Sequence, residues 1–248
     1  MDIEIVQLGD LGVWDFKKVA RLDAEAWQKV LFAEHETDSP YRIHMEEYER
    51  LRERCKRFPE GQIVAYCHDP RFNEPVGVIN SLRINVPDID AVPRTWHGLT
   101  GNGYFTTHEE DGNMQACVSI VAMPLDDVPP ELREEYKNQQ VSRKLINAQL
   151  KLANDSDMDY MIAYSRPANY AKNKAKYPSM NEYLEAVKRG DVNDPIGMHL
   201  HFGAAIWKVL PNGRKDEDAG HYNVIMRYPL VKDAPKPEST QEAVLTRT

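Results

Sequence analysis

Polar side chains at the expected start of a helix could bind a phosphate. The run VSRKL at 141–145 places a hydroxyl at Ser142 and positive charges at Arg143 and Lys144. The first turn of a helix adds unpaired backbone N–H groups and the positive end of the helix dipole. Together these groups suit a phosphate or a pyrophosphate. No glycine stands nearby to let the backbone approach such a ligand, so a helix whose polar residues simply face solvent is the alternative interpretation.

Two histidines could transfer protons. Imidazole exchanges a proton near neutral pH, which makes His199 a candidate general base, and His201 follows two residues later. A metal site is disfavoured, because no carboxylate or cysteine follows the pair at ligand spacing. The cysteines, Cys55, Cys67 and Cys117, are widely spaced and form no C-x-x-C pair. We therefore expect free thiols, without zinc or redox chemistry.

Length and charge limit the function classes. With 248 residues, 42% of them hydrophobic, the chain is long enough to bury an adequate core. A net charge of −8 disfavours a nucleic-acid partner, since the basic stretch at 171–178 has acidic segments on either side. No apolar window approaches the length of a membrane span, and the N-terminus is acidic, unlike a secretory signal. We expect no membrane partner and a cytoplasmic location.

Hydrophobic periodicity indicates the elements that must position these residues. Alternating or β-rich runs predict strands at 3–8, 62–69, 75–85, 103–108, 114–124, 159–167, 203–213 and 222–230. Apolar stripes at helical spacing predict helices at 14–27, 45–58, 141–152 and 179–190. The third carries Val141, Leu145, Ala148 and Leu152 on one face, and Ser179 stands where it can cap the fourth. This order predicts an α+β fold with a mixed sheet, in one domain over residues 1–230. The proline-rich, aperiodic end predicts a disordered tail at 231–248.

The order of the elements and several motifs resemble the GNAT superfamily of acyl-CoA-dependent acyltransferases. The run SIVAMP resembles the family strand that ends in a proline before the pyrophosphate loop. The runs TWHGLTGNGYFTTHEEDGN, YSRPANY and DPIGMHLHFGA resemble further segments of a subset of the family, in the same order. The resemblance spans roughly residues 3–230. It implies a mostly antiparallel sheet of about seven strands, flanked by helices on both faces.

The family loop, written Q/R-x-x-G-x-G/A, is degenerate in this chain. If 141–145 aligns with the start of the family helix, its small positions fall on Gln140 and Ser142 and its Q/R position on Lys137. The run LDDVPPELRE also looks inserted ahead of the loop. The resemblance implies that the CoA is bound by Gln139, Gln140, Val141, Ser142, Arg143 and Lys144.

The resemblance also implies how a thioester is held. A backbone N–H in the segment from Val121 to Met123 is expected to bind the thioester oxygen, where two strands splay apart. A central strand with every N–H paired is the alternative. His199 is expected near the acyl group, as a general base.

The same resemblance implies roles for other side chains. Ser165 and Arg166 could contact the acyl group or a substrate carboxylate, because arginine binds a carboxylate at two points; a salt bridge at the end of the sheet is the alternative. Tyr170 could protonate the departing thiolate. Thr107 and His108 could line the acceptor site if their loop folds over the cleft, and are otherwise bystanders.

Three functions stand as hypotheses. The first is an N-acyltransferase that acts on a small-molecule amine, with acetyl-CoA or another acyl-CoA as co-substrate and no metal. The second is an S-acyltransferase or acyl-CoA decarboxylase of the polyketide-loading type, with an acyl carrier protein as candidate partner. The third is an acyl-CoA-binding protein without catalysis. We expect a monomer or a homodimer in each case.

Overall fold

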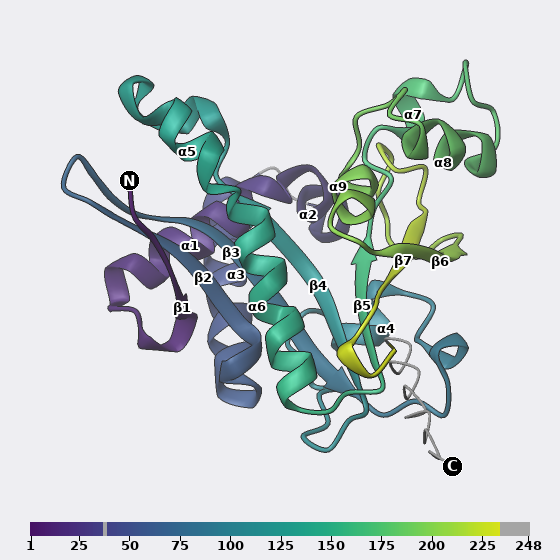
Figure 1. The fold of residues 1–248 in the computed structure, drawn as a ribbon, viewed down its shortest axis with the longest axis horizontal. Coiled ribbons are helices and arrows are strands. Elements are labelled where there is room, and N and C mark those ends of the chain that lie inside the picture. Colours follow the sequence, from purple (N-terminus) through teal and green to yellow (C-terminus); the bar gives the residue numbers. More distant parts are fainter. Residues whose placement is uncertain (37–38, 234–248) are drawn as a thin grey trace, which may run out of the picture.

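The computed structural model describes residues 1–36 and 39–233. Within these residues, seven strands form one sheet in the order β1-β2-β3-β4-β5-β7-β6, with helices on both of its faces (Figure 1). Neighbouring strands are antiparallel, except β4 and β5, which are parallel. This confirms the expected α+β fold with a mixed, mostly antiparallel sheet.

Most expected elements are present near their expected bounds. The strands are β1 (Ile3–Gln7), β2 (Gln62–Asp69), β3 (Phe72–Ile84), β4 (Met114–Ala122), β5 (Tyr160–Ser165), β6 (Ala205–Leu210) and β7 (Asn223–Tyr228). The helices are α1 (Val13–Ala26), α2 (Gln28–His35), α3 (Pro40–Arg57), α4 (Trp96–Thr100), α5 (Arg133–Gln139), α6 (Val141–Asp155), α7 (Tyr170–Asn173), α8 (Met180–Lys188) and α9 (Pro195–His201). The sequence pattern did not predict α2, α4, α5, α7 or α9.

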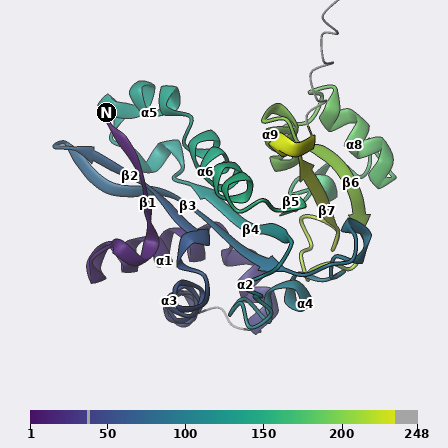
Figure 2. The same ribbon diagram turned by 60° about the horizontal axis from the view of Figure 1, so that its bottom comes forward.

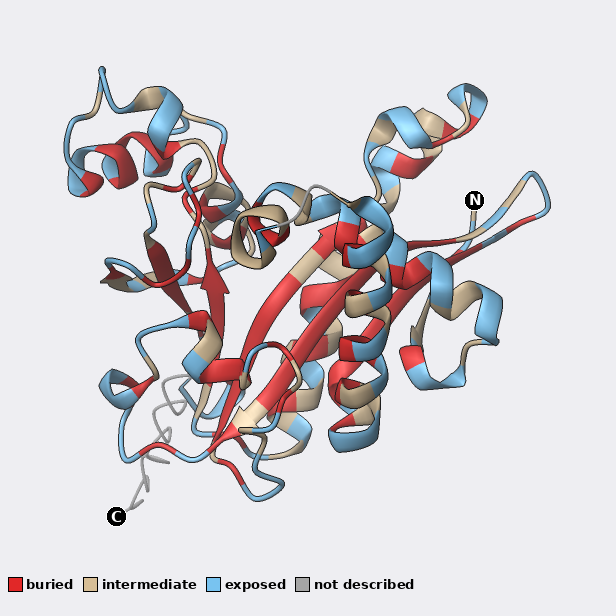
Figure 3. Cartoon of the chain, turned by 180° about the vertical axis from the view of Figure 1, so that it is seen from behind, coloured by how far each residue is buried: buried red, intermediate tan, exposed pale blue. Residues whose placement is uncertain are grey.

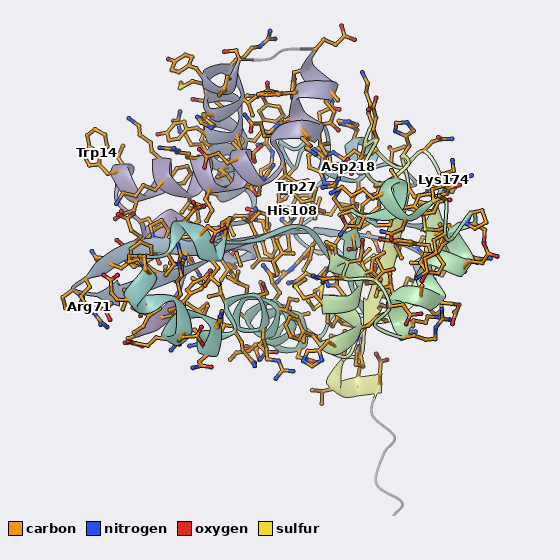
Figure 4. The ribbon with its side chains drawn as sticks, turned by 90° about the horizontal axis from the view of Figure 1, so that it is seen from above. Trp14, Trp27, Arg71, His108, Lys174 and Asp218 are labelled. Atoms are coloured by element: carbon orange, nitrogen blue, oxygen red, sulfur yellow. The ribbon has the colours of Figure 1, made fainter. Side chains whose placement is uncertain are left out.

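The helices form two layers around the sheet. Helices α1, α2 and α3 lie on one face, and α5 and α6 lie on the other (Figure 4). Helices α8 and α9 lie beside β6 and β7 (Figure 2). Buried residues concentrate in the central strands between the layers (Figure 3). No helix in the described part of the chain is long and apolar enough to cross a membrane.

Helix α6 packs on the sheet through an apolar face. Val141, Leu145 and Ile146 are buried, whereas Ala148 and Leu152 of the expected stripe are half-buried. The helix is confirmed, and its most buried face is turned slightly from the expected one. Because α6 begins beside the end of β4, it can support a ligand that enters at this edge.

Helix α8 begins with the expected serine cap. Ser179 Oγ accepts a hydrogen bond from the Glu182 N–H at 3.2 Å, and the Glu182 carboxylate accepts one from the Ser179 N–H at 3.0 Å. This reciprocal pair satisfies two backbone donors that the helix itself leaves free.

The expected strand at 103–108 is wrong. Gly103 and Phe105 have φ angles of 87° and 58°, which are incompatible with extended backbone. Phe105 is fully buried, and Thr107 Oγ1 donates to the Leu99 carbonyl. Residues 103–108 therefore form a turn that folds back on α4, although their side chains are typical of a strand.

The first residues of the tail that was expected to be disordered, 231–233, are ordered. Val231–Asp233 form a short 3-10 helix, in which the Asp233 carboxylate accepts from the Leu230 N–H at 3.0 Å. Lys232 Nζ also pairs with Asp159 at 2.8 Å. The remainder of the predicted tail, 234–248, lies outside the described residues.

Candidate active site

Strands β4 and β5 separate after a short parallel pairing. Their Cα partners run from Met114 with Tyr160 to Cys117 with Ala163, while β4 continues to Ala122. The two strands diverge toward the top of Figure 1. Beyond Cys117, the edge of β4 that faces β5 pairs with no strand among the described residues. The alternative of a fully paired central strand is therefore wrong.

The ladder with β3 determines which N–H groups of β4 face the opening. The Met123 N–H donates to the Val76 carbonyl at 2.8 Å. Hydrogen-bonded pairs alternate along an antiparallel ladder, so the Val121 N–H also turns toward β3. The N–H groups of Ile120 and Ala122 point the other way, toward β5. Within the expected segment from Val121 to Met123, Ala122 is thus the residue whose N–H faces the opening. Val121 and Met123 turn their N–H groups toward β3, because the direction of the N–H alternates along a strand.

A cavity of about 250 Å³ lies at this separation. Its walls come from β3, β4, β5, β7, α6 and α9, together with the end of α1, and they are mostly apolar. Its lining includes the polar side chains of Trp27, Ser119, Tyr164, Ser165, Arg166, His199 and Tyr228. The structure thus brings together His199, Ser165, Arg166 and Val121 from the predicted site. It adds Trp27, Ser119 and Tyr228, which sequence reasoning missed.

His199 is held against Tyr228 inside the cavity. Its Nδ1 atom lies 2.7 Å from the Tyr228 hydroxyl oxygen, and both side chains are buried. The ring stands on α9, which begins where the Asp194 carboxylate accepts the Ile196 N–H at 3.0 Å. His201, at the end of the same helix, is exposed. The short helix thus separates the two histidines: one faces the cavity and the other faces solvent.

Burial determines the charge state of this pair. It lowers the pKa of His199 to about 4, so the imidazole is neutral at pH 7. It also raises the pKa of Tyr228, which keeps its hydrogen. When Tyr228 donates to Nδ1, the ring hydrogen of His199 is on Nε2. Such an imidazole is a weak base and a good hydrogen-bond donor.

Arg166 is already paired. Its Nε and Nη2 atoms lie 2.5 and 2.7 Å from the two carboxylate oxygens of Asp216, and its guanidinium carbon lies 5.7 Å from the Trp27 ring centroid. The salt bridge at the end of the sheet is therefore present, so a substrate carboxylate has to compete with Asp216 for this guanidinium. The neighbouring Ser165 lines the cavity, and its carbonyl accepts from Asn223 Nδ2 at 3.2 Å.

Ser119 connects the cavity to the helix layer behind it. Its hydroxyl donates to Asp23 Oδ1 at 2.8 Å and accepts from Trp27 Nε1 at 3.1 Å. Trp27 lies between the helices and the middle of the sheet, whereas Trp14 lies at the outer end of this layer (Figure 4). The sequence carries one signal for Asp23: a carboxylate four residues after the apolar Val19 lies on the same helical face, and that face of α1 is buried.

Three predicted residues do not line the cavity. Tyr170 donates to the Pro178 carbonyl at 3.1 Å. His108 Nδ1 accepts from the Arg83 N–H at 3.1 Å, near the opposite end of β4. Thr107 bonds back to its own loop. Their loop therefore does not fold over this cavity, and roles for these residues remain predictions that this arrangement does not favour.

The start of α6 divides the predicted CoA residues into two groups. Gln139 Nε2 and Lys144 Nζ turn toward β1, where they donate to the carbonyls of Met1 and Ile3 at 3.1 and 3.3 Å. The Arg143 guanidinium lies 5.1 Å from the Phe202 ring centroid, on the side of α9. Of the basic pair, Arg143 is thus the one placed between α6 and α9.

Gln140 gives this loop the backbone shape of a glycine. It precedes α6 with φ 49° and ψ 52°, in the left-handed region that glycine adopts without steric cost. The Arg143 N–H then donates to the Gln140 carbonyl at 2.8 Å. The first N–H groups of α6 have no partner within the helix and, with Ser142 and Arg143, they form the candidate phosphate site.

Comparisons with known proteins support the same architecture. No family model matches the chain. The GNAT-like decarboxylase GphF in complex with isobutyryl-CoA is 20% identical, with a TM-score of 0.62 over 92% of this chain and 98% of that chain. The loading GNATL domain of CurA from Lyngbya majuscula is 20% identical, with a TM-score of 0.57 over the same shares.

One curated protein is related in sequence. The probable hydrolase YhcX of Bacillus subtilis (strain 168) is 28% identical over 190 residues, which make up 76% of this chain and 34% of YhcX. The chain thus spans about a third of the length of this relative. The strand order, the separation of β4 from β5 and the two similar structures together show that this chain has the fold of the GNAT superfamily.

Proposed function

We propose that this protein binds an acyl-CoA and transfers the acyl group to a small-molecule amine. The opening between β4 and β5 carries this proposal, because a cavity there lies beside the outward-facing N–H groups of Ile120 and Ala122. Donors fixed in advance stabilise the oxyanion that forms during acyl transfer. The GNAT fold supports the proposal, as does a similar structure described as a complex with isobutyryl-CoA.

In this proposal the diphosphate and the thioester of the acyl-CoA occupy two different sites. The diphosphate binds the first turn of α6 with Ser142 and Arg143, and the thioester lies in the cavity. The amine nitrogen attacks the carbonyl carbon: a C–N bond forms, the C–S bond breaks, and the sulfur leaves as a thiolate. His199, which stays neutral, donates a hydrogen bond to the thioester oxygen. Acetyl-CoA is the first donor to test, and the apolar walls also suit larger uncharged acyl groups.

The His199–Tyr228 pair favours a second candidate, decarboxylation of a carboxyacyl-CoA such as malonyl-CoA. There the bond to the carboxylate carbon breaks, carbon dioxide leaves, and the electron pair forms a thioester enolate. The enolate carbon then takes up a proton from water to give the acyl-CoA product. A neutral imidazole can donate an N–H hydrogen bond to the enolate oxygen and still keep its proton. Two similar structures are described as a GNAT-like decarboxylase and a loading domain. An acyl carrier protein is the corresponding acyl acceptor.

One experiment separates these reactions. The protein is mixed with acetyl-CoA, isobutyryl-CoA or malonyl-CoA, with and without a panel of amines. Free thiol is measured with a colorimetric thiol reagent, and acyl products are identified by mass spectrometry. Amine-dependent thiol release supports acyl transfer, whereas conversion of malonyl-CoA to acetyl-CoA without an amine supports decarboxylation. Binding of CoA in calorimetry without turnover indicates an acyl-CoA-binding protein, and absence of binding contradicts the proposal.

A further inference from the structure

Ser119 is the polar group that joins the cavity to a buried network of charges. It stands on β4 between Ile120, which borders the opening, and Val118. Its one hydroxyl hydrogen is given to Asp23 Oδ1, and one of its lone pairs accepts the Trp27 N–H. A serine hydroxyl has two lone pairs, so one remains to accept a hydrogen from a molecule in the cavity.

The network behind Ser119 contains more acid than base. Asp23 lies 3.6 Å from Arg54 Nη1, and Glu47 lies 2.9 Å from Arg54 Nη2. Arg50 pairs with Glu47 and with Glu46, at 3.4 and 3.0 Å. Two guanidinium groups thus face three carboxyl groups. Asp23 and Glu47 are buried, whereas Glu46 is half-buried and also lies 3.3 Å from His35 Nε2.

Asp23 is the carboxyl group of this network that gains and loses a proton most readily. Burial, followed by the charge of Glu47, raises the pKa of Asp23 to about 7. Burial also acts on Glu47, but the nearby Arg54 and Arg50 keep the pKa of this carboxyl group below its ordinary value. Asp23 can therefore gain and lose a proton near neutral pH.

The groups on the other sides of Asp23 do not compete for this role. Across a void of about 10 Å³, Arg214 is bound to both oxygens of Glu34, at 2.7 and 3.0 Å. Glu34 also pairs with His97 at 3.1 Å, and the pKa of Glu34 is lowered to about 2 despite its burial. This neighbouring cluster is thus already paired and leaves Asp23 to exchange its proton with Ser119.

The other titratable groups at the cavity do not exchange protons near pH 7. Burial lowers the pKa of His199 to about 4 and raises that of the Cys117 thiol to about 12. It also raises the pKa of both phenols, Tyr164 and Tyr228. Arg166 is a permanent cation, paired with a carboxylate. Acyl transfer to an amine nevertheless needs a proton acceptor near the reacting nitrogen.

We propose that Ser119 and Asp23 form a proton relay for the reaction in the cavity, a role that rests on the proposed function. As the amine nitrogen bonds to the carbonyl carbon, its proton passes to Ser119 Oγ and the hydroxyl proton of Ser119 passes to Asp23 Oδ1. When the C–S bond breaks, the proton returns along the same path to the leaving thiolate. Asp23 acts through Ser119 and is a positioning residue, whereas Ser119 contacts the substrate.

The test compares Ser119→Ala, Asp23→Asn and the double variant with the full-length wild-type chain. Each protein is assayed for turnover of the thioester and amine that the wild type accepts, between pH 5 and 9. We expect kcat to fall about 100-fold in each single variant, with CoA affinity within threefold of the wild type. The double variant is expected to be no slower than Asp23→Asn, because the two residues act as one unit.

The pH profile is the readout that a purely structural role would not change. The wild-type kcat/KM is expected to rise with pH as Asp23 loses its proton, and both single variants are expected to lose this rise. All proteins use the same acceptor, so its own titration is common to every profile. Ser119→Thr, which keeps the hydroxyl, is expected to restore kcat to within about tenfold.

A matched control separates stability from catalysis. Ser81 is a buried serine on β3 whose hydroxyl donates to Gln149 Oε1 at 2.8 Å, outside the cavity. Ser81→Ala is expected to lower the unfolding midpoint about as much as Ser119→Ala and to leave kcat and the pH profile unchanged. Ser119→Ala also leaves the charged network in place, should Asp23→Asn fail to fold.

Two results would overturn the relay. If Ser119→Ala and Asp23→Asn keep the wild-type kcat and pH profile while their unfolding midpoints fall, the pair is structural only, and the proposed function stands. If the wild type binds no CoA and turns over no thioester, the proposed function fails first, and the relay fails with it. The wild-type assay distinguishes these outcomes before any variant is made.

Discussion

The Nδ1 atom of His199 lies 2.7 Å from the hydroxyl oxygen of Tyr228, on the wall of the cavity where β4 and β5 part. The histidine comes from α9 and the tyrosine from the last residue of β7. This contact fixes the imidazole ring, and burial, which lowers the pKa of His199 to about 4, keeps it neutral. The site therefore offers a hydrogen-bond donor at the position where a general base was expected.

Replacement of Tyr228 by phenylalanine should damage catalysis more than binding. The buried Nδ1 of His199 then loses its partner, which costs about 1–3 kcal/mol of stability and frees the ring to turn. We expect kcat to fall about 10- to 100-fold, with little change in KM for the acyl-CoA. Steady-state kinetics and urea unfolding measure both effects, with His201→Ala as control, since that histidine is exposed. Unchanged kcat in Tyr228→Phe would contradict a role for this contact.

Replacement of Asp216 by asparagine should change the choice of acyl group. The amide keeps the shape of the carboxyl group and removes the charge that pairs with Arg166. A guanidinium without a carboxylate partner attracts a substrate carboxylate more strongly, so we expect affinity for malonyl-CoA to rise about tenfold relative to acetyl-CoA. Calorimetry with both thioesters measures the ratio. An unchanged ratio would mean that Arg166 does not reach the acyl group.

Two neighbouring basic residues should contribute unequally to CoA binding. Arg143 lies between α6 and α9, whereas the Lys144 ammonium is bound to the Ile3 carbonyl on the side of β1. We expect Arg143→Ala to weaken CoA binding about tenfold and Lys144→Ala to weaken it less than threefold. The difference should shrink in high salt, because screening weakens the attraction to the diphosphate. Equal losses in the two variants would place the diphosphate elsewhere.

The contacts of Glu34 with His97 and Arg214 should give stability that depends on pH. The pKa of Glu34 is lowered to about 2 in the folded protein, so its contribution is complete above the unfolded value of about 4.5 and is lost as the pH falls toward 2. We expect Glu34→Gln to cost about 3 kcal/mol at pH 7 and clearly less at pH 3. Urea unfolding at both values tests this, with the exposed Glu134→Gln as control. An equal loss at the two pH values would show that the carboxylate charge is not responsible.

The sequence alone determined the elements that local pattern controls. Alternation predicted the seven strands that form the sheet, helical stripes predicted the long helices, and Ser179 was correctly predicted to cap α8. The ordered motifs predicted the GNAT fold. The strand expected at 103–108 was wrong, because Gly103 and Phe105 have positive φ angles, which favour a turn over extended backbone.

The tertiary structure alone decided which side chains meet at the site. Ser119 lies 96 residues from Asp23 along the chain, and Tyr228 lies 29 residues from His199. No local period relates such positions, because the contacts depend on how strands pair and where β4 leaves β5. The charge states depend on the same packing, since burial and nearby charges shift each pKa. Local side-chain pattern therefore determines the sheet strands and the helices α1, α3, α6 and α8, and only the packing of the elements determines what the site can do.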